Sequence, residues 1–442
     1  MAKKKQDSAI STVAEEARAR IKIAIDADGM NRQHAIDAMR FAAGDQWPTE
    51  IKMQRQLDKR PCLTINKTDT FVRSVVNNMR QQRPRIKVHP VADGADQQTA
   101  EVIEGLTRHI EVSSNAELAY DTAADHQVRM GWGYWRIVGQ YVSETSFEQE
   151  LLIKRIRNPF SVYFDPSSQE PDGSDARWCV ITGKMTRDEF TKKYPKATLS
   201  DIANLGAGDG LADWATKEEV TVAEYYRIEE EQQELLRLSD GSTIWANDVK
   251  GPEDLLRRGV VAIDRRPSMR RVVKWSKISA LEELESTTVA GRYIPVIPVY
   301  GAEMLDGGKV HRYGMVKNLM DPQKMYNFWR TQETEFVALA PKAPWLIADG
   351  QDEGHEHEWD NANIKNYSRL IYKPVQDDQG NPLPPPQRTP PQQVPAASVN
   401  AAMAASEDIK AVAGMFDPAL GAPGQETSGV MVAKRQGQSD LS

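Results

Sequence analysis

One stretch of the chain, Asp321–Ala340, constrains the fold more than any other, because its sequence DPQKMYNFWRTQETEFVALA predicts a long helix. Asp321 can cap the first free backbone N–H groups, and Pro322 then takes the first helical position, where its missing N–H costs nothing. One face of such a helix carries apolar residues, interrupted by Gln332: Met325, Trp329, Phe336 and Leu339. The helix would be roughly 30 Å long, and Pro341 and Pro344 would end it.

A second helix is predicted at Ala396–Gly414, which is rich in alanine and ends in a glycine suited to a left-handed cap. The intervening residues 341–395 are typical of turns and short strands and include the proline-rich segment Asn381–Pro395. The sequence therefore predicts a long helical hairpin with an elaborated tip.

The part of the chain before this hairpin mixes the two kinds of secondary structure, so an α+β fold is expected. Helices are predicted at 12–43, with an interruption at Asp28–Gly29, and at Thr68–Gln82, Ala100–Ala124 and 186–195. Strands are predicted at Arg85–Val91, Met130–Val142, Leu151–Ile156, Ser161–Phe164, Val220–Ile228, Ser242–Trp245 and Arg265–Ser276, and Tyr293–Tyr300 is expected at a sheet edge because of its two prolines.

Composition limits the possible functions. A chain of 442 residues exceeds one ordinary core, so two or more domains are expected. The net charge of −7 disfavours a protein that wraps nucleic acid by neutralising phosphates. Cys62 and Cys179 show no metal-binding spacing and are expected to stay reduced. No uncharged apolar run is long enough to predict a membrane span.

The sequence contains no established catalytic or cofactor-binding motif, so neither an enzyme nor a cofactor is predicted. Two alternatives remain open. A metal-dependent enzyme could use the cluster His355–Glu358, in which His355 and His357 alternate with glutamates. A nucleic-acid-binding strand could present a basic face with Trp275 as a stacking residue: Arg265, Arg266, Arg270, Arg271 and Lys274.

Six motifs in one order resemble the tailed-phage portal proteins (head-to-tail connectors), specifically those of short-tailed phages. They are FAAGDQW with a following Arg55 and RPCLTIN; the helix leading into QQRPRIKVHPV; MGWGYWRI; RNPFSVYFDPSSQEPDGSDARW; GMVKNLMDPQKMYNFWRTQETE; and AVAGMFDPALGAPGQETSGVMVAKRQGQ. Together they extend over about residues 35–440.

The resemblance implies a portal-type α+β subunit. Residues 1–320 would form N-terminal helices and a mixed α/β wing, 321–340 and 396–414 the two stem helices, and 341–395 a small α/β clip. Residues 415–429 would form a tunnel loop and 430–442 the start of a tunnel helix. Portal proteins of this branch continue into a crown and often a barrel, so a C-terminally shortened subunit is expected.

It also implies the partners and the location. Portal subunits form a homo-oligomeric, dodecameric ring in the virion, at one capsid vertex, and are present in the host cytoplasm during assembly. The partners are scaffolding and capsid proteins, the large terminase subunit and later tail or adaptor proteins. Double-stranded DNA would pass through the channel without sequence specificity.

Three sets of site residues follow from the resemblance. The stem helices would contribute Asp321, Pro322, Gln323, Asn327, Trp329, Ala402 and Ser406. The DNA channel would be lined by Lys410, Gln425, Ser428, Lys434 and Arg435. The motor and tail proteins would dock at His355, His357, Trp359 and Arg369.

Overall fold

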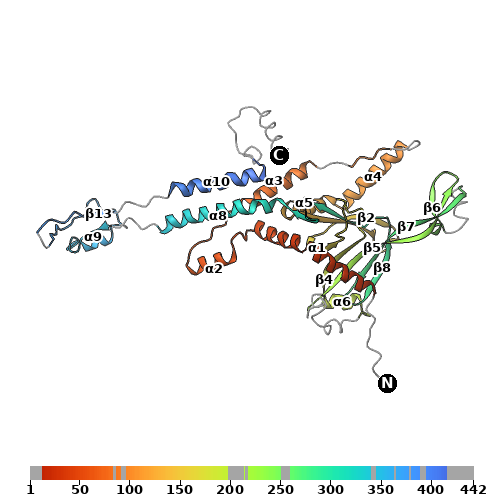
Figure 1. Ribbon diagram of the computed structural model, residues 1–442, viewed down its shortest axis with the longest axis horizontal. Coiled ribbons are helices and arrows are strands. Elements are labelled where there is room, and N and C mark those ends of the chain that lie inside the picture. Colours follow the sequence, from red (N-terminus) through yellow and green to blue (C-terminus); the bar gives the residue numbers. More distant parts are fainter. Residues whose placement is uncertain are drawn as a thin grey trace, which may run out of the picture. The chain divides into compact units, whose positions relative to one another are not determined.

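The computed structural model describes residues 12–82, 86–90, 96–197, 214, 218–249, 259–339, 345–362, 365–377, 380–388 and 395–415. The chain divides into two compact units. Unit 1 comprises residues 1–39 and 75–317, and unit 2 comprises residues 40–74 and 318–442. The fold is α+β, as the sequence predicts (Figure 1).

Unit 1 contains two main sheets. The larger, six-stranded sheet has the order β3-β4-β5-β7-β8, with β6 paired to β5, and the smaller has the order β2-β1-β9. The strands of the larger sheet are β3 (Val162–Phe164), β4 (Trp178–Thr186), β5 (Glu219–Leu238), β6 (Thr243–Trp245), β7 (Ala262–Ile278) and β8 (Glu283–Val289). The smaller sheet consists of β1 (Trp132–Tyr141), β2 (Gln149–Arg155) and β9 (Val296–Tyr300). A separate hairpin is formed by β10 (Ala302–Asp306) and β11 (Lys309–Tyr313).

Most predicted strands are confirmed, including the edge position of β9, which carries Pro298. The strand predicted at Arg85–Val91 is wrong for its described part, because residues 86–90 pair with no described strand. Prolines 84 and 90 remove backbone donors at both ends of that segment.

Helix α1 (Thr12–Ala42) covers the larger sheet with small side chains. Ala14, Ala17 and Ala24 are buried against residues of the sheet that include Trp178, Val180, Tyr225 and Ile278. The predicted interruption at Asp28–Gly29 is wrong, since α1 is continuous. Buried residues on both sides, Ala24 and Asn31, hold the helix through Gly29, which costs only about 1 kcal/mol relative to alanine.

The single helix predicted at Ala100–Ala124 is two helices, α4 (Gln97–Ser113) and α5 (Ala116–Met130). Asn115 separates them with a positive φ of 49°. Asparagine tolerates this left-handed conformation better than most residues. Helix propensity averaged over the whole segment does not reveal such a break at one residue. Unit 1 also contains α6 (Arg187–Lys193), which begins with a capping box between Thr186 and Glu189.

The end of α5 packs directly on backbone, and glycines make this possible. A Cβ at Gly133 would lie 2.2 Å from the carbonyl oxygen of Ala123, and one at Gly314 would lie 2.5 Å from that of Val128. Gly131 ends α5 with a φ of 107° and lies against the backbone of Tyr313. The motif MGWG therefore encodes a close approach of helix and strand.

Unit 2 contains α2 (Thr49–Leu57), much of α8 (Met315–Leu339), and α10 (Ala396–Ala413). The boundaries of the units fall within α1, α3 (Thr68–Gln81) and α8. Between α8 and α10 the chain forms a β-pair of β12 (Trp345–Leu346) and β13 (Gln387–Arg388), and the short helix α9 (Glu356–Asp360). The predicted glycine cap of the second helix is confirmed, with Gly414 at φ 66°.

The predicted start of the first long helix is wrong. Helix α8 begins at Met315, and Pro322 lies inside it rather than at its first position. Asp321 is not a cap: its side chain is 92% exposed and contacts Lys324 at 3.3 Å. The fully buried side chains of Val316 and Leu319 fix the additional turns, and this packing outweighs the backbone hydrogen bond that proline removes.

We predict that Gly133→Ala destabilises the protein, because no side chain fits between β1 and α5. Forced overpacking costs about 1–3 kcal/mol, so the free energy of unfolding in urea should fall by this amount. Gly139→Ala is the matched control on the same strand, where a Cβ meets no atom within 4 Å. Equal stability of the two variants would contradict the prediction.

We predict that the buried residue His126 of α5 makes the protein less stable in acid. Burial lowers the pKa of His126 below its ordinary 6.5, and Arg129 adds to this against the opposing effect of Asp125. The unfolded chain then binds the proton more tightly, so stability is lost as the pH falls through about 6.5. Thermal unfolding at about pH 7.5 and 5.5 should show a smaller acid-induced drop for His126→Gln than for the unchanged chain. His109→Gln, at an exposed position of α4, should keep the full drop.

Candidate functional site

A row of polar side chains on α8 faces the interior of unit 2. Gln323, Asn327 and Thr331 are at most 1% exposed, and their spacing of four residues places them on one face of the helix. They bind an extended segment, Leu63–Lys67. Thr331 Oγ1 accepts from the Leu63 N–H (3.2 Å), Asn327 Oδ1 from the Ile65 N–H (3.0 Å) and Gln323 Oε1 from the Lys67 N–H (3.0 Å), while Gln323 Nε2 donates to the Ile65 carbonyl (2.8 Å).

The two backbones match in period. Four helical residues rise about 6 Å, and two residues of extended chain span about 6.6 Å. Every second N–H of the segment therefore meets the next polar side chain of α8. We call this arrangement the polar clamp: Gln323, Asn327 and Thr331 on Leu63–Lys67.

The polar clamp continues into a wider network. Asn327 Nδ2 donates to Gln46 Oε1 (2.6 Å), and Gln46 Nε2 donates to Asn66 Oδ1 (2.9 Å). One turn beyond Thr331, Glu335 forms ion pairs with Arg55 (2.5 Å) and Arg60 (3.2 Å). Sequence analysis selected Gln323 and Asn327 but missed Gln46, Thr331 and Glu335. The signal was present as a polar residue at every fourth position from Gln323 to Glu335.

The apolar residues predicted on one face of α8 are therefore not the residues that α8 buries. Met325 is 51% exposed, and Trp329 and Phe336 are only half-buried; the side chain of Leu339 lies outside the described residues. The backbone N–H groups of Leu63–Lys67 need acceptors, and the polar face of α8 supplies them. Large apolar residues consequently point outward on α8 and also on α10: Met325, Phe328, Val337, Met403 and Val412.

Helix α10 buries Ala402, Ala405 and Ile409. Ser406 accepts a hydrogen bond from Lys67 Nζ at 2.6 Å, and the same ammonium lies 4.2 Å from the ring centroid of Tyr326. Lys67 thus joins α10 to α8. Lys410 is paired with Glu407 at 3.0 Å. The other channel residues of the sequence analysis, Gln425, Ser428, Lys434 and Arg435, lie outside the described residues.

Gln351 organises the segment between the two helices. It is 1% exposed; its Oε1 accepts from the Ala348 N–H (2.9 Å), its Nε2 donates to the Pro384 carbonyl (3.0 Å), and its carbonyl accepts from the Lys373 N–H (2.8 Å). Trp345 and Trp359 pack edge to face at 5.4 Å. One buried amide and one tryptophan pair thus hold together the segment between α8 and α10.

The predicted docking residues lie on this segment in different settings. His355 Nδ1 is 3.8 Å from Glu358, and His357 Nδ1 is 3.4 Å from Asn361 Nδ2. Trp359 donates to the Ile371 carbonyl at 2.8 Å, so it stabilises the segment itself, whereas Arg369 is exposed. Among the described residues, no group of three or more His, Cys, Asp or Glu side chains could hold a metal ion, so the metal-enzyme hypothesis gains no ligand set.

The predicted basic face of β7 is not a free positive surface. Strand β7 pairs with β5, which is acidic, and the two extend as a long ribbon that carries β6 (Figure 1). Arg270 binds Asp248 (2.7 Å), Lys274 binds Glu231 (3.2 Å), and Arg265 lies 3.9 Å from Glu234. Trp275 is half-buried and its Nε1 donates to Glu224 (3.3 Å). The hypothesis of one exposed basic face is therefore wrong.

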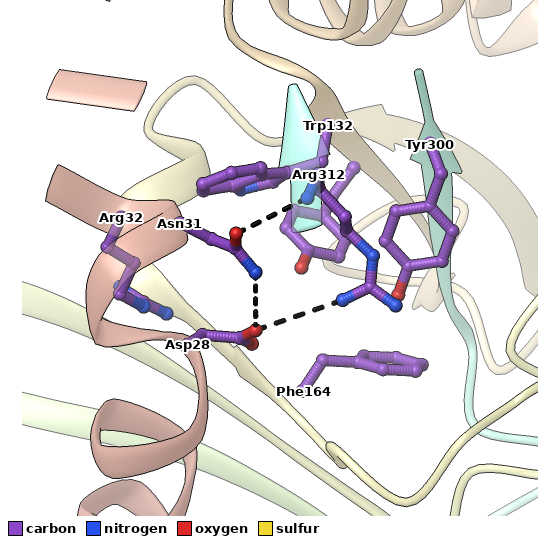
Figure 2. Close-up of a pocket in the computed structure, with 8 residues that line it drawn as sticks. Asp28, Asn31, Arg32, Trp132, Phe164, Tyr300 and Arg312 are labelled. Atoms are coloured by element: carbon purple, nitrogen blue, oxygen red, sulfur yellow. Dashed lines mark hydrogen bonds and ion pairs between the residues drawn. The ribbon is translucent and has the colours of Figure 1, made fainter. Parts of the chain in front are cut away.

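A second polar cluster connects α1 to the β10–β11 hairpin of unit 1, beside Tyr300 of β9 (Figure 2). Asn31 Nδ2 donates to the Val310 carbonyl (2.8 Å), and Asn31 Oδ1 accepts from the Arg312 N–H (3.3 Å). The Arg312 guanidinium stacks 4.0 Å from the Tyr300 ring centroid and lies 4.0 Å from Asp28. The cavity among these residues is about 10 Å³, enough for about one water molecule. It is an anchor, not a ligand site.

Comparison with known proteins identifies the family. The model of the phage P22-like portal protein family matches residues 18–442. The chain belongs to this family. A portal protein of Acyrthosiphon pisum secondary endosymbiont phage 1 is 26% identical over 394 residues, which cover 85% of this chain and 54% of that protein. The chain thus spans about half the length of this relative. Portal proteins are structural proteins rather than enzymes.

Three of the motifs on which the resemblance rests contribute to the polar clamp and its network. FAAGDQW contains Gln46, RPCLTIN contains Leu63–Asn66 of the clamped segment, and the fifth motif contains Gln323, Asn327 and Thr331. Three separate stretches are therefore parts of one interaction. Among the described helices, none is long and apolar enough to cross a membrane.

We predict that Asn327→Leu destabilises unit 2 of this portal protein. The change removes the acceptor of the Ile65 N–H and the donor to Gln46 Oε1, and the Gln46 side chain is only 3% exposed. A buried group left unsatisfied costs about 1–3 kcal/mol. Urea unfolding should show a loss of this order. Gln332→Leu, at an exposed position of the same helix, should lose almost nothing. A similar loss in both variants would mean that the polar clamp does not stabilise the protein.

Proposed function

We propose that the chain is a subunit of a homo-oligomeric, dodecameric ring at one vertex of a phage capsid, through which double-stranded DNA is packaged and ejected. The observation that carries this proposal is the family match over residues 18–442. The ring would reside in the virion and assemble in the host cytoplasm, together with scaffolding and capsid proteins.

The parts of the subunit take their roles from this proposal. Residues 1–320 would form the N-terminal helices and the wing. Residues 321–340, which include most of α8, and residues 396–414, which include α10, would form the stem. The segment held by Gln351 corresponds to the clip, at which the large terminase subunit and later tail or adaptor proteins dock, with His355, His357, Trp359 and Arg369 as candidate contacts. Residues 415–429 would form the tunnel loop, and 430–442 the start of a tunnel helix.

Two physical features support assembly around a DNA channel. The apolar side chains that point outward from α8 and α10 would be covered by neighbouring subunits. The net charge of −7 and the pairing of Lys410 with Glu407 disfavour tight retention of a polyanion. Lys410, Gln425, Ser428, Lys434 and Arg435 would then contact the passing DNA without reading its sequence.

The native mass of the purified chain tests this proposal. Mass photometry at two salt concentrations should give particles of twelve subunits, each of 49.6 kDa, and negative-stain images should show rings with a central channel. Monomers at every concentration and both salt levels would contradict self-assembly of this chain.

We predict that Phe328→Asp, on the exposed apolar face of α8, shifts these particles to monomers. A buried carboxylate at an apolar subunit contact costs several kcal/mol, while the exposed position leaves the subunit folded. Thr334→Asp, at an exposed position about half a turn around α8 from Met325, adds the same charge away from the apolar face and should still assemble. Circular dichroism checks that both variants remain helical.

A further inference from the structure

Unit 1 contains a cavity of about 360 Å³ where the base of the β1–β2 hairpin meets the larger sheet. Its walls include Arg155, Ile156 and Arg157, which follow one another at the end of β2. Ile181, Met185 and Val222 from β4 and β5 supply further apolar surface. A cavity of this size lies within the range of ordinary ligand sites.

The cavity is strongly basic. Arg136, Arg155, Arg157, Lys184 and Lys277 line it, and Glu224 is its one acidic lining residue. That carboxylate is already held by Arg136 Nη1, with both oxygens at 3.0 Å. Within the part of the chain that the structure describes, the exposed guanidinium groups of Arg155 and Arg157 contact no carboxylate. Burial, and then the nearby Lys193, lower the pKa of Lys277 against the opposing effects of Glu285 and Glu224.

The far end of the same hairpin has the opposite character. Phe147 is 97% exposed, and the loop around it, residues 141–150 (YVSETSFEQE), contains three glutamates and no basic residue. Tyr141 and Val142 are also more than half exposed. An apolar side chain that is almost fully exposed to water among several negatively charged glutamates is typical of a contact surface.

These two surfaces cannot meet within one subunit. They lie at opposite ends of the β1–β2 hairpin, in which Arg155 pairs with Trp135 and Gln149 with Tyr141. The six residue steps from Arg155 to Gln149 span about 20 Å at the rise of a strand. A complementary contact therefore requires a second molecule.

We propose that the loop 141–150 of one subunit inserts Phe147 into the basic cavity of a neighbouring copy, with Glu144 and Glu148 paired to Arg155 and Arg157. This contact is heterologous, because it joins two different patches, and such contacts generate rings when the rotation closes. The inference rests on the proposed ring and names one contact that would close it.

The lining favours a peptide over a nucleic acid as the occupant. It contains no aromatic residue on which a base could stack, whereas Ile156, Ile181, Met185 and Val222 offer apolar contacts that a phosphate backbone cannot use. The loop 141–150 supplies both a phenyl ring and carboxylates.

A peptide experiment tests recognition independently of ring formation. A fluorescent peptide YVSETSFEQE should bind the full chain with a Kd below about 1 mM, and Arg155→Glu with Arg157→Glu should weaken binding at least tenfold. Lys154→Glu is the matched control, because Lys154 is exposed on the same strand and does not line the cavity. Absence of binding, or equal binding of a peptide in which serine replaces Phe147, would overturn the inference.

Cross-linking tests the contact in the assembled protein. With Cys62→Ser, the pair Phe147→Cys and Met185→Cys should give a ladder of disulfide-linked subunits on oxidation, and each single cysteine variant should give none. Rings that form without this ladder would overturn the contact and leave the proposed ring intact. Monomers without cross-links would contradict both.

A charge swap gives the second readout. Arg155→Glu with Arg157→Glu should reduce the ring fraction, and Glu144→Lys with Glu148→Lys in the same chain should restore it, because opposite charges again face each other. Failure of the swap to restore the rings lost through the first pair would argue against pairing of these residues.

Discussion

The hydrogen bonds between α8 and the segment Leu63–Lys67 are the constraint on which unit 2 depends. An extended segment that pairs with no strand has no sheet partners for its N–H groups, and α8 supplies the acceptors as side chains at helical spacing. Rotation of α8 by one residue would remove all of them. The polar clamp thus fixes the rotation of α8, and with it the outward direction of Met325 and Phe328. The apolar surface offered for assembly is a consequence of a polar interior.

The elements of unit 1 are held together differently, by close packing of backbone and by a few partly buried cations. Arg32 donates to the carbonyls of Phe160 (2.8 Å) and Val162 (2.5 Å), which joins α1 to the start of β3. The glycines of MGWG bring α5 onto β1. Arg136 and Glu224 then join the smaller sheet to the larger one beside the basic cavity. The β1–β2 hairpin is therefore held firmly at its base, while its tip extends into solvent.

Sequence reasoning predicted the elements better than their faces. Alternation and glycine spacing were sufficient for β1, for β7 and for the cap at Gly414, because these signals are local. The start of α8 and its buried face could not be predicted in this way. A proline normally lies in the first turn of a helix, whereas Pro322 lies inside α8. Hydrophobic periodicity assumes that the buried face of a helix is apolar, whereas the buried face of α8 binds the backbone of Leu63–Lys67 through polar side chains. Likewise, the basic residues of β7 resembled a binding face because their acidic partners are distant in sequence: Glu231 and Glu234 on β5, and Asp248.

Charge pairing separates the cations of this protein into two kinds. Arg270 with Asp248, Lys274 with Glu231 and Lys410 with Glu407 each lie beside a carboxylate, so a DNA phosphate would have to displace an existing partner to bind there. Such surfaces suit a channel through which DNA moves. Arg155 and Arg157 differ, because they border a partly apolar cavity and have no such partner among the described residues. In the proposed ring, another protein surface would neutralise these two charges. The exposed acidic loop of a second subunit has the chemistry to do so.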